Sequence, residues 1–204
     1  MPDQTTDDAA LLGAAVRGDE AAFAALYARH AAAIYRFAAR LLGDATVAED
    51  VTHDCFLGLI KNPANFQAAR SPLRTYLYGA ARNLAHKRFR AQNQETCLDD
   101  LTDAGEELID RGLGASPLRE LLDDELARAV QQAVAALPPL QREALVLFEY
   151  EELTLAEIAV ITGAEVGSVK ARLHRARRRL RESLRLYLDG TGVVANLSEE
   201  HEHA

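Results

Sequence analysis

The stretch TLAEIAVITGAEVGSVKARLHRARRRL, residues 154–180, carries the clearest local structure in the chain. Thr154 is followed three residues later by Glu157, the capping box that begins a helix by satisfying its free first-turn amides. Gly163 stands where a helix end needs a left-handed residue. After a short turn, Val166 begins a longer helix. The stretch therefore predicts a short helix, a glycine turn and a second helix.

The second of these helices combines a narrow apolar stripe with a basic outer face. Residues 166–185 hold eight Lys or Arg against one Glu. A DNA-binding helix-turn-helix presents its second helix to the major groove, where early residues reach base edges and later arginines contact phosphates. The stretch favours DNA binding, and the alternative is a structural hairpin with a solvated arginine face. The stripe consists of Val169, Leu173, Ala176, Leu180 and Leu184.

The rest of the 204-residue chain is also helical in character. Apolar residues make up 49% and aromatic residues only 6%, and alanine and leucine favour helix over strand. Asp19 is expected to begin one helix that Gly43 ends, and Asp44 to begin the next. Asn62-Pro63 breaks that helix, and Pro72 suits the first turn of a third. No segment shows the alternation of a strand, so we expect an all-α fold.

Changes in composition and charge along the chain divide it into two helical domains, 19–91 and 121–188. Residues 92–120 are acidic and glycine-containing and are expected to form a flexible linker. Residues 189–204 form an acidic tail. The architecture predicted is therefore two small all-α domains joined by an acidic linker.

The net charge of −8 conceals basic islands. Residues 70–90 hold six Lys or Arg and no Asp or Glu, whereas residues 95–125 hold eleven Asp or Glu and two Arg. At a Debye length of ~8 Å, a local basic patch attracts phosphates even on an acidic chain. Both islands therefore favour nucleic acid, although a charge run alone can be a solvated helix face.

Other chemistries find little support. The acidic N-terminus and the short uncharged stretches predict neither a secretory leader nor membrane insertion, so we expect a cytoplasmic protein. Cys55 and Cys97 cannot make a disulfide scaffold, and a redox pair is disfavoured. His53-Asp54-Cys55 and the triplet His201–His203 are weak metal candidates. No phosphate loop or catalytic constellation is present, so neither an enzyme nor a cofactor is expected.

Four segments, in order, resemble the extracytoplasmic-function (ECF) sigma factors of the bacterial sigma-70 family. Residues 48–57, AEDVTHDCFL, are similar to the family's AEDLVQEVFL, and residues 73–85, LRTYLYGAARNLA, to WLYRIARNLA. Residues 137–144, LPPLQREA, are similar to LPPRQREV, and residues 154–179 resemble the promoter-reading helix-turn-helix. The resemblance implies sigma region 2 in the first domain and sigma region 4 in the second.

The resemblance implies three partners: core RNA polymerase, promoter DNA and an anti-sigma factor. On the polymerase, the largest-subunit coiled coil and the β-subunit flap are the implied contacts. For Phe56 a core position is as good an explanation as an interface position. The residues implied to dock on the coiled coil are Asp50, Val51, Asp54, Phe56 and Leu57.

The first domain is also implied to bind and help melt the minus-ten element, with the loop 62–71 at the position that captures a flipped-out base. Arginine and lysine follow phosphates, while an asparagine can read a base edge; Asn83 has a helix-packing role as its alternative. The residues implied are Arg74, Arg82, Asn83, Lys87, Arg88 and Arg90.

The second domain is implied to read the minus-thirty-five element. Three positions depart from the family pattern. In the first domain, Tyr76 replaces a common Trp and His86 replaces a common acid. In the second domain, Glu165 replaces a common Ser or Thr, and glutamate is a weaker helix N-cap than either. The residues implied to approach DNA are Ser168, Lys170, Ala171, Arg172, His174, Arg175 and Arg178.

The alternative function is a helix-turn-helix regulator that binds an operator without entering polymerase. Such a protein has no need of the two segments at 48–57 and 73–85. Their presence favours the sigma factor.

Overall fold

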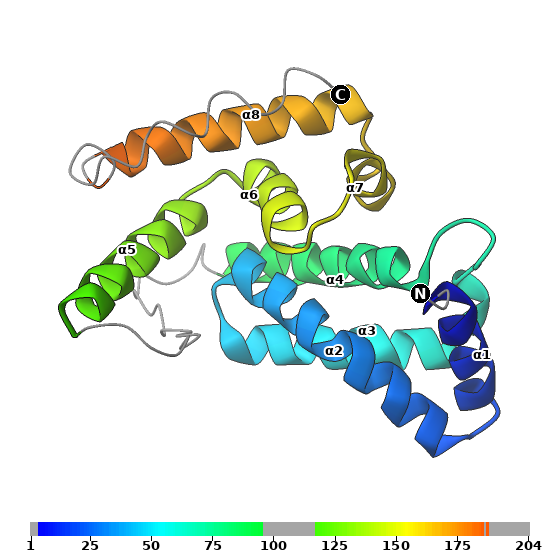
Figure 1. The fold of residues 1–204 in the computed structure, drawn as a ribbon. Helices are drawn as coiled ribbons and strands as arrows, with labels where there is room; N and C mark the ends of the chain where they lie inside the picture. Colours follow the sequence, from blue (N-terminus) through cyan, green and yellow to red (C-terminus); the bar gives the residue numbers. More distant parts are fainter. Residues whose placement is uncertain (1–3, 96–116, 186, 188–204) are drawn as a thin grey trace.

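The computed structural model describes residues 4–95, 117–185 and 187. The described residues form helices and turns and contain no strand, so the predicted all-α class is confirmed. The N-terminal domain contains α1 (Gln4–Val16), α2 (Glu20–Leu42), α3 (Ala45–Lys61) and α4 (Leu73–Glu95), with a 3₁₀ turn at Pro63–Asn65 (Figure 1).

The C-terminal domain contains α5 (Pro117–Ala135), α6 (Pro139–Leu145), α7 (Leu155–Thr162) and α8 (Val166–Ser183). A π-helical turn, Val146–Tyr150, extends α6. Figure 1 shows α6 and α7 lying over α4, with α8 beyond α6. Helix α4 is therefore the element on which the two domains meet.

The predicted helix ends are present. The carboxylates of Asp19 and Asp44 accept hydrogen bonds from first-turn amides at 3.0 and 2.9 Å. Thr154 and Glu157 form the reciprocal capping box. Gly43 and Gly163 end α2 and α7 with φ of +72° and +64°, a left-handed conformation that is costly for residues with a Cβ.

One helix was missing from the sequence-based prediction. Helix α1 precedes the predicted start at Asp19 and packs on α2. Its Asp8 is buried and pairs with Arg29 and with His30, whose Nε2 lies 2.9 Å from the carboxylate. His30 therefore contacts a buried carboxylate from a helix that the apolar periodicity did not identify.

Two helices extend into the predicted linker. Helix α4 continues to Glu95, and α5 begins at Pro117. Proline fits the first turn of a helix, because its missing N–H has no intrahelical partner there. Residues 96–116 of the linker lie outside the described residues, as does the whole acidic tail, 189–204.

The buried apolar side chains of the two domains form one contiguous cluster. In the N-terminal domain it is built on Leu26, Phe37, Val51 and Leu77. The rings of Phe37 and Tyr78 meet nearly at right angles, with 5.3 Å between centroids. Helix α4 is buried on more than one side: Leu73, Tyr78, Ala81 and Ala85 are all buried. Among the described residues, no helix is long and apolar enough to cross a membrane.

Candidate nucleic-acid interface

Helix α8 presents a basic face to solvent because its apolar stripe is buried. Val169, Leu173 and Ala176 are at most 4% exposed and pack within the C-terminal domain. Arg172 is half-buried at the edge of the stripe. The other residues predicted to read DNA on this helix are exposed: Ser168, Lys170, Ala171, His174, Arg175 and Arg178.

The start of α8 is free of a side-chain cap. Glu165 occupies the N-cap position without a capping hydrogen bond, as its poor capping propensity predicts. Further along the helix, Arg177 donates to Glu149 at 2.6 Å and lies over the Phe148 ring. Arg178 lies 3.8 Å from Glu182 in an exposed pair, which solvent screens strongly. The outer face of α8 is preformed and accessible.

The basic island of α4 is divided between solvent and the domain junction. Asn83, Lys87 and Arg88 are exposed. Arg88 pairs with Asp54 of α3 at 3.0 Å, so a residue predicted for DNA contacts one predicted for polymerase. The side chain of Arg90 lies outside the described residues, although its backbone belongs to α4.

Arg82 faces the C-terminal domain and donates to the carboxylate of Glu143 in α6. Its side chain is 17% exposed, whereas Glu143 is completely buried. The second carboxylate oxygen lies 3.3 Å from Nε2 of His86 without hydrogen-bonding geometry. A buried carboxylate requires a cationic partner such as Arg82, because burial in low dielectric strongly disfavours an isolated charge.

Glu151, which follows the π-helical turn, makes a second contact of this kind. Its carboxylate accepts from the Tyr78 hydroxyl at 2.5 Å and lies 3.5 Å from Arg40, while its backbone carbonyl accepts from Arg74. Burial, followed by the hydrogen bond to Glu151, raises the pKa of Tyr78 well above its usual value. The phenol therefore remains a proton donor to this carboxylate at neutral pH.

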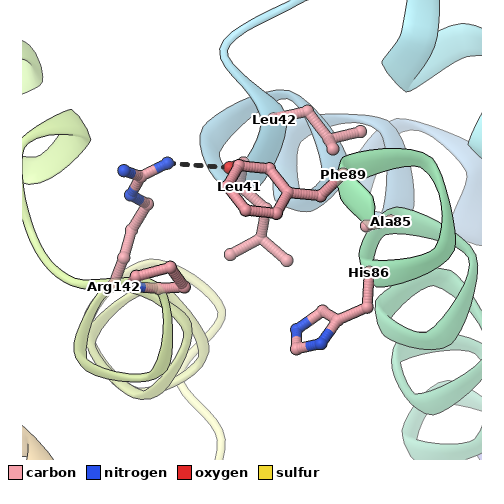
Figure 2. Close-up of a pocket in the computed structure, with 7 residues that line it drawn as sticks. Leu41, Leu42, Ala85, His86, Phe89 and Arg142 are labelled. Atoms are coloured by element: carbon pink, nitrogen blue, oxygen red, sulfur yellow. Dashed lines mark hydrogen bonds between the residues drawn. The ribbon is translucent and has the colours of Figure 1, made fainter. Parts of the chain in front are cut away.

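Further contacts at the junction come from Arg40 and Arg142. The Arg40 guanidinium lies 4.4 Å from the centre of the Tyr150 ring. Arg142 of α6 donates to the Leu41 carbonyl at 2.8 Å. Beside it lies a small apolar cleft of about 90 Å³ between α2, α4 and α6 (Figure 2). It is lined by Leu41, Leu42, Ala85, His86, Phe89, Pro139 and Arg142.

The residues predicted to dock on polymerase separate into two groups. Asp50, Asp54 and Leu57 are exposed on α3, and Leu57 is 50% exposed despite its apolar side chain. Val51 and Phe56 lie in the core instead, and Phe56 contacts Tyr27 at 4.8 Å between ring centroids. The interface role predicted for these two is corrected accordingly: they support the exposed strip from beneath, because the apolar period of α3 turns them inward.

Metal binding finds no support in the part of the chain described here, where no group of three or more His, Cys, Asp or Glu side chains is arranged to hold an ion. In the segment His53-Asp54-Cys55, the first two side chains are exposed and Cys55 is buried. Burial raises the pKa of the Cys55 thiol to about 12. Cys97 and the tail histidines lie outside the described residues.

The residues that sequence reasoning missed are the acids at the junction, Glu143 and Glu151. Glu143 lies within the quoted LPPLQREA segment, and Glu151 belongs to the acidic stretch EYEE at 149–152. Neither feature distinguishes a buried carboxylate from an exposed one, since the side chains that donate hydrogen bonds to these carboxylates are 61 or more residues away along the chain.

Comparison with known proteins agrees with this two-domain arrangement. Residues 26–95 match the family described as sigma-70 region 2, and residues 127–180 match sigma-70, region 4. The ECF RNA polymerase sigma factor SigW of Bacillus subtilis is 34% identical, over 83% of this chain and 92% of its own length. The RNA polymerase sigma-H factor of Pseudomonas aeruginosa is 33% identical, over 82% of this chain and 89% of its own.

Solved structures show the same fold. The sigma factor RpoE from Bartonella quintana, crystallised with the anti-sigma factor NepR, superposes with a TM-score of 0.67 at 24% identity. That match covers 80% of this chain and 97% of the other. CnrH in complex with the cytosolic domain of CnrY gives a TM-score of 0.63 at 26% identity, covering 88% and 98%. Both family regions, in order and with these relatives, establish that the chain belongs to the extracytoplasmic-function sigma factors of the sigma-70 family.

Proposed function

We propose that this chain is an alternative sigma factor that binds core RNA polymerase, directs it to specific promoters and helps melt the minus-ten region. The observation that carries the proposal is the ordered pair of sigma regions, the second of which exposes the basic face of a helix-turn-helix. An operator-binding regulator is not favoured, because it would have no use for a region 2 domain.

We assign reading of the minus-thirty-five element to α8. The early exposed residues Lys170, Ala171, His174 and Arg175 are in the part of the helix that enters a major groove, and Arg178 is one turn later, where phosphate contact is expected. Ser168 and Arg172 complete the assigned set. The support is the accessibility of this face and its charge.

We assign the minus-ten element to the basic island of α4 and to the loop before it. Arg74, Arg82, Asn83, Lys87, Arg88 and Arg90 form the assigned set. In the loop, Phe66 packs against Tyr76 at 5.5 Å between centroids, so Tyr76 retains the packing function of the Trp that is common at this position. Aromatic and cationic groups in proximity suit an unstacked single strand.

Polymerase docking is assigned to the exposed strip Asp50, Asp54 and Leu57 of α3, supported from below by Val51 and Phe56. An apolar side chain between carboxylates is complementary to a basic helical partner such as the largest-subunit coiled coil. We assign the β-subunit flap to the C-terminal domain. The relative crystallised with NepR supports an anti-sigma factor as a further partner.

The proposal also includes the mode of action, the cellular location and the domain bounds of the chain. The chain acts by binding rather than by catalysis, without a cofactor, and works in the cytoplasm beside core polymerase. We place the functional domains at 19–91 and 121–188, with 92–120 as a linker and 189–204 as a tail.

The deciding experiment is run-off transcription with purified core polymerase on sheared genomic DNA. The full chain should produce discrete transcripts that core polymerase alone does not, and it should co-elute with the core enzyme. An isolated chain that bound a defined operator at nanomolar affinity and left the core enzyme unchanged would instead identify the operator-binding regulator.

A further inference from the structure

Four cations on the exposed side of α8 have no counter-charge in the part of the chain that the structure describes. No carboxylate there lies within ion-pair distance of any of them, whereas the neighbouring Arg177 pairs with Glu149. Two of the four are four residues apart, a spacing at which like charges on a helix repel. We call these four residues the unpaired cations of α8: Lys170, Arg175, Arg179 and Arg181.

The acidic tail, residues 189–204, carries carboxylates that are suited to supply this counter-charge. Glu199, Glu200 and Glu202 occur within four residues and follow a spacer, 190–198, that holds no charged residue. The tail contains no Lys or Arg that would be repelled by a basic helix. It is therefore complementary in charge to the exposed side of α8.

The spacer is long enough for the tail glutamates to reach the whole of α8. Tyr187 is the last described residue, and Glu199 follows it by twelve residues. Covalent geometry lets a chain of that length span at most ~40 Å. Helix α8, with 18 residues, is only ~27 Å long. The glutamates can therefore reach back to the first turns, where Lys170 and Arg175 lie, whereas acids directly after the helix would reach only its last turns.

We propose that the acidic tail folds back along α8 and that Glu199, Glu200 and Glu202 pair with its unpaired cations in competition with DNA phosphate. A carboxylate and a phosphate offer an arginine the same kind of charged acceptor. Attachment to the same helix gives the tail an effective concentration of about millimolar, which compensates for pairs that are individually weak in solvent. This inference rests on the proposed function only in taking α8 as the surface that binds DNA.

The contact is expected to depend strongly on salt, because both partners are exposed to solvent. At low ionic strength the tail lowers the apparent DNA affinity in proportion to the fraction of chains in which α8 is free. DNA then displaces the tail in place of small ions, so the tail also reduces the salt dependence of DNA binding. In 0.5 M salt the Debye length is only about 4 Å, and the tail should have little effect.

The first test locates the tail directly and without DNA. A nitroxide spin label is attached at Ala204→Cys in a Cys97→Ser background, in which the remaining Cys55 is buried. At 50 mM NaCl the label should broaden the backbone amide signals of α8 but not those of α3, and the broadening should disappear at 0.5 M NaCl. Absence of broadening on α8 at 50 mM NaCl, or broadening confined to the basic island of α4, would overturn the inference.

The second test removes the counter-charge and keeps the length of the tail. The triple variant Glu199→Gln, Glu200→Gln and Glu202→Gln should lose the broadening of α8. It should also bind a fluorescein-labelled, mixed-sequence DNA duplex about threefold more tightly at 50 mM NaCl and with parental affinity at 0.5 M NaCl. The threefold gain corresponds to a free fraction of α8 that rises from about a third to one. An unchanged affinity at 50 mM NaCl would contradict competition with DNA.

A control of equal net charge separates contact from general repulsion of DNA. The triple variant Glu20→Gln, Glu125→Gln and Glu152→Gln neutralises three exposed acids outside the tail. It should retain the broadening of α8 and bind the duplex within about 1.5-fold of the parent, since solvent screens exposed charges that make no contact. Equal gains in affinity for the two triple variants would show that the acids act through net charge alone and would overturn the inference.

Two further measurements identify the occupant and keep the proposed function separate. When spin-labelled chain of natural isotope content is mixed with unlabelled, ¹⁵N-enriched chain, no broadening of α8 is expected. Broadening in that mixture would place the tail on a second copy of the chain and would overturn the intramolecular contact. The sigma function is read by run-off transcription with the parental chain, and its failure would refute that function even if the tail is found on α8.

Discussion

The chain carries two basic surfaces, on α8 and on α4, and the structure leaves their cationic side chains exposed to different extents. On α8, the assigned DNA contacts apart from Arg172 are exposed, because the acids of the C-terminal domain approach only its flank and its end. On α4, Asn83, Lys87 and Arg88 are also exposed, but Arg82 contacts the buried carboxylate of Glu143 and Arg74 donates to the backbone carbonyl of Glu151, both from the other domain. The sequence around the two surfaces is equally basic, so local charge does not account for the difference.

What differs is the source of the counter-charge. Arg177 and Glu149 pair within one domain, so the pair remains when the domains move. Arg82 and Glu143 pair across the junction, so their contact depends on the packing of the two domains against each other. The comparison teaches that a basic run indicates where phosphate can bind, whereas a distant partner such as Glu143 decides how exposed an arginine such as Arg82 is.

The largest expected effect tests what orients α8. Leu173→Ala should lower the free energy of unfolding of the C-terminal domain by ~2–5 kcal/mol, because it leaves a cavity under the apolar stripe. Leu173 is 4% exposed. Urea denaturation followed by circular dichroism measures the change, with the exposed Lys170→Ala as control. Similar effects for the two variants would mean that the stripe does not fix which face is exposed.

The next largest effect distinguishes base contacts from phosphate contacts along α8. Arg175→Ala should weaken holoenzyme binding to the preferred minus-thirty-five element by ~1–3 kcal/mol and relax preference at one base pair. Arg178→Ala should weaken all sequences alike and reduce the log–log salt slope by about one unit. Binding across single-base variants at several salt concentrations measures both.

Arg177 provides the internal control for that series. Because it is already paired with Glu149 and stacked on Phe148, Arg177→Ala should change neither base preference nor salt slope. If Arg175 and Arg178 variants behaved like Arg177→Ala, α8 would not be the DNA reader.

The stability of the N-terminal domain is expected to depend on alkaline pH. The buried Cys55 belongs to the N-terminal domain and has its pKa raised from 9.0 to about 12. Between these values the unfolded thiol loses its proton while the folded thiol keeps it, so stability that is full below pH 9 falls as pH rises. The slope contributed by this group approaches ~1.4 kcal/mol per pH unit.

Unfolding titrations at pH 8 to 10.5 in a Cys97→Ser background isolate this contribution. The Cys55→Ala variant should lose the extra slope, and the native thiol should resist alkylation at pH 8 until the chain is unfolded. Rapid alkylation of the native chain would contradict the buried, protonated thiol.

The smallest effect concerns the exposed pair on α3 and α4. Asp54→Asn breaks its contact with Arg88, but both side chains are more than 40% exposed, so the free energy of unfolding should change by less than ~1 kcal/mol. Affinity for core polymerase should nevertheless fall, since Asp54 is assigned to that interface. Glu49→Gln, also exposed on α3, is the control, and equal losses from both variants would indicate a general charge effect.

The sequence by itself determined the features that depend on neighbours along the chain. Capping at Asp19, Asp44 and Thr154 needs partners only three residues away, and the left-handed ends at Gly43 and Gly163 follow from residue type. The helical periodicity that predicts Val169 and Leu173 to be buried also predicts that the residues of α8 assigned to DNA bases are exposed. These features are local, so a one-dimensional pattern contains them.

Two features, the helix α1 and the burial of Phe56, could not be predicted from the periodicity of apolar residues. Helix α1 was not predicted, because the contacts that hold it, such as Asp8 with His30 and the burial of Leu12 in the core, come from the rest of the fold. Phe56 was equally compatible with core and surface, and packing against Tyr27 places it inside. In both cases the deciding neighbour lies more than twenty residues away.

The tertiary structure alone decided the state of the minus-ten surface. From the sequence, Arg82 and His86 share an outer face of a helix, and Glu143 and Glu151 are ordinary acids. Folding brings them together, because α4 is buried by its own domain on one side and by α6 and α7 on the other. A charge becomes buried or exposed through the whole fold, and electrostatic interactions strengthen as water is excluded, so neither the burial of these acids nor the occupation of the arginines could be read from the chain.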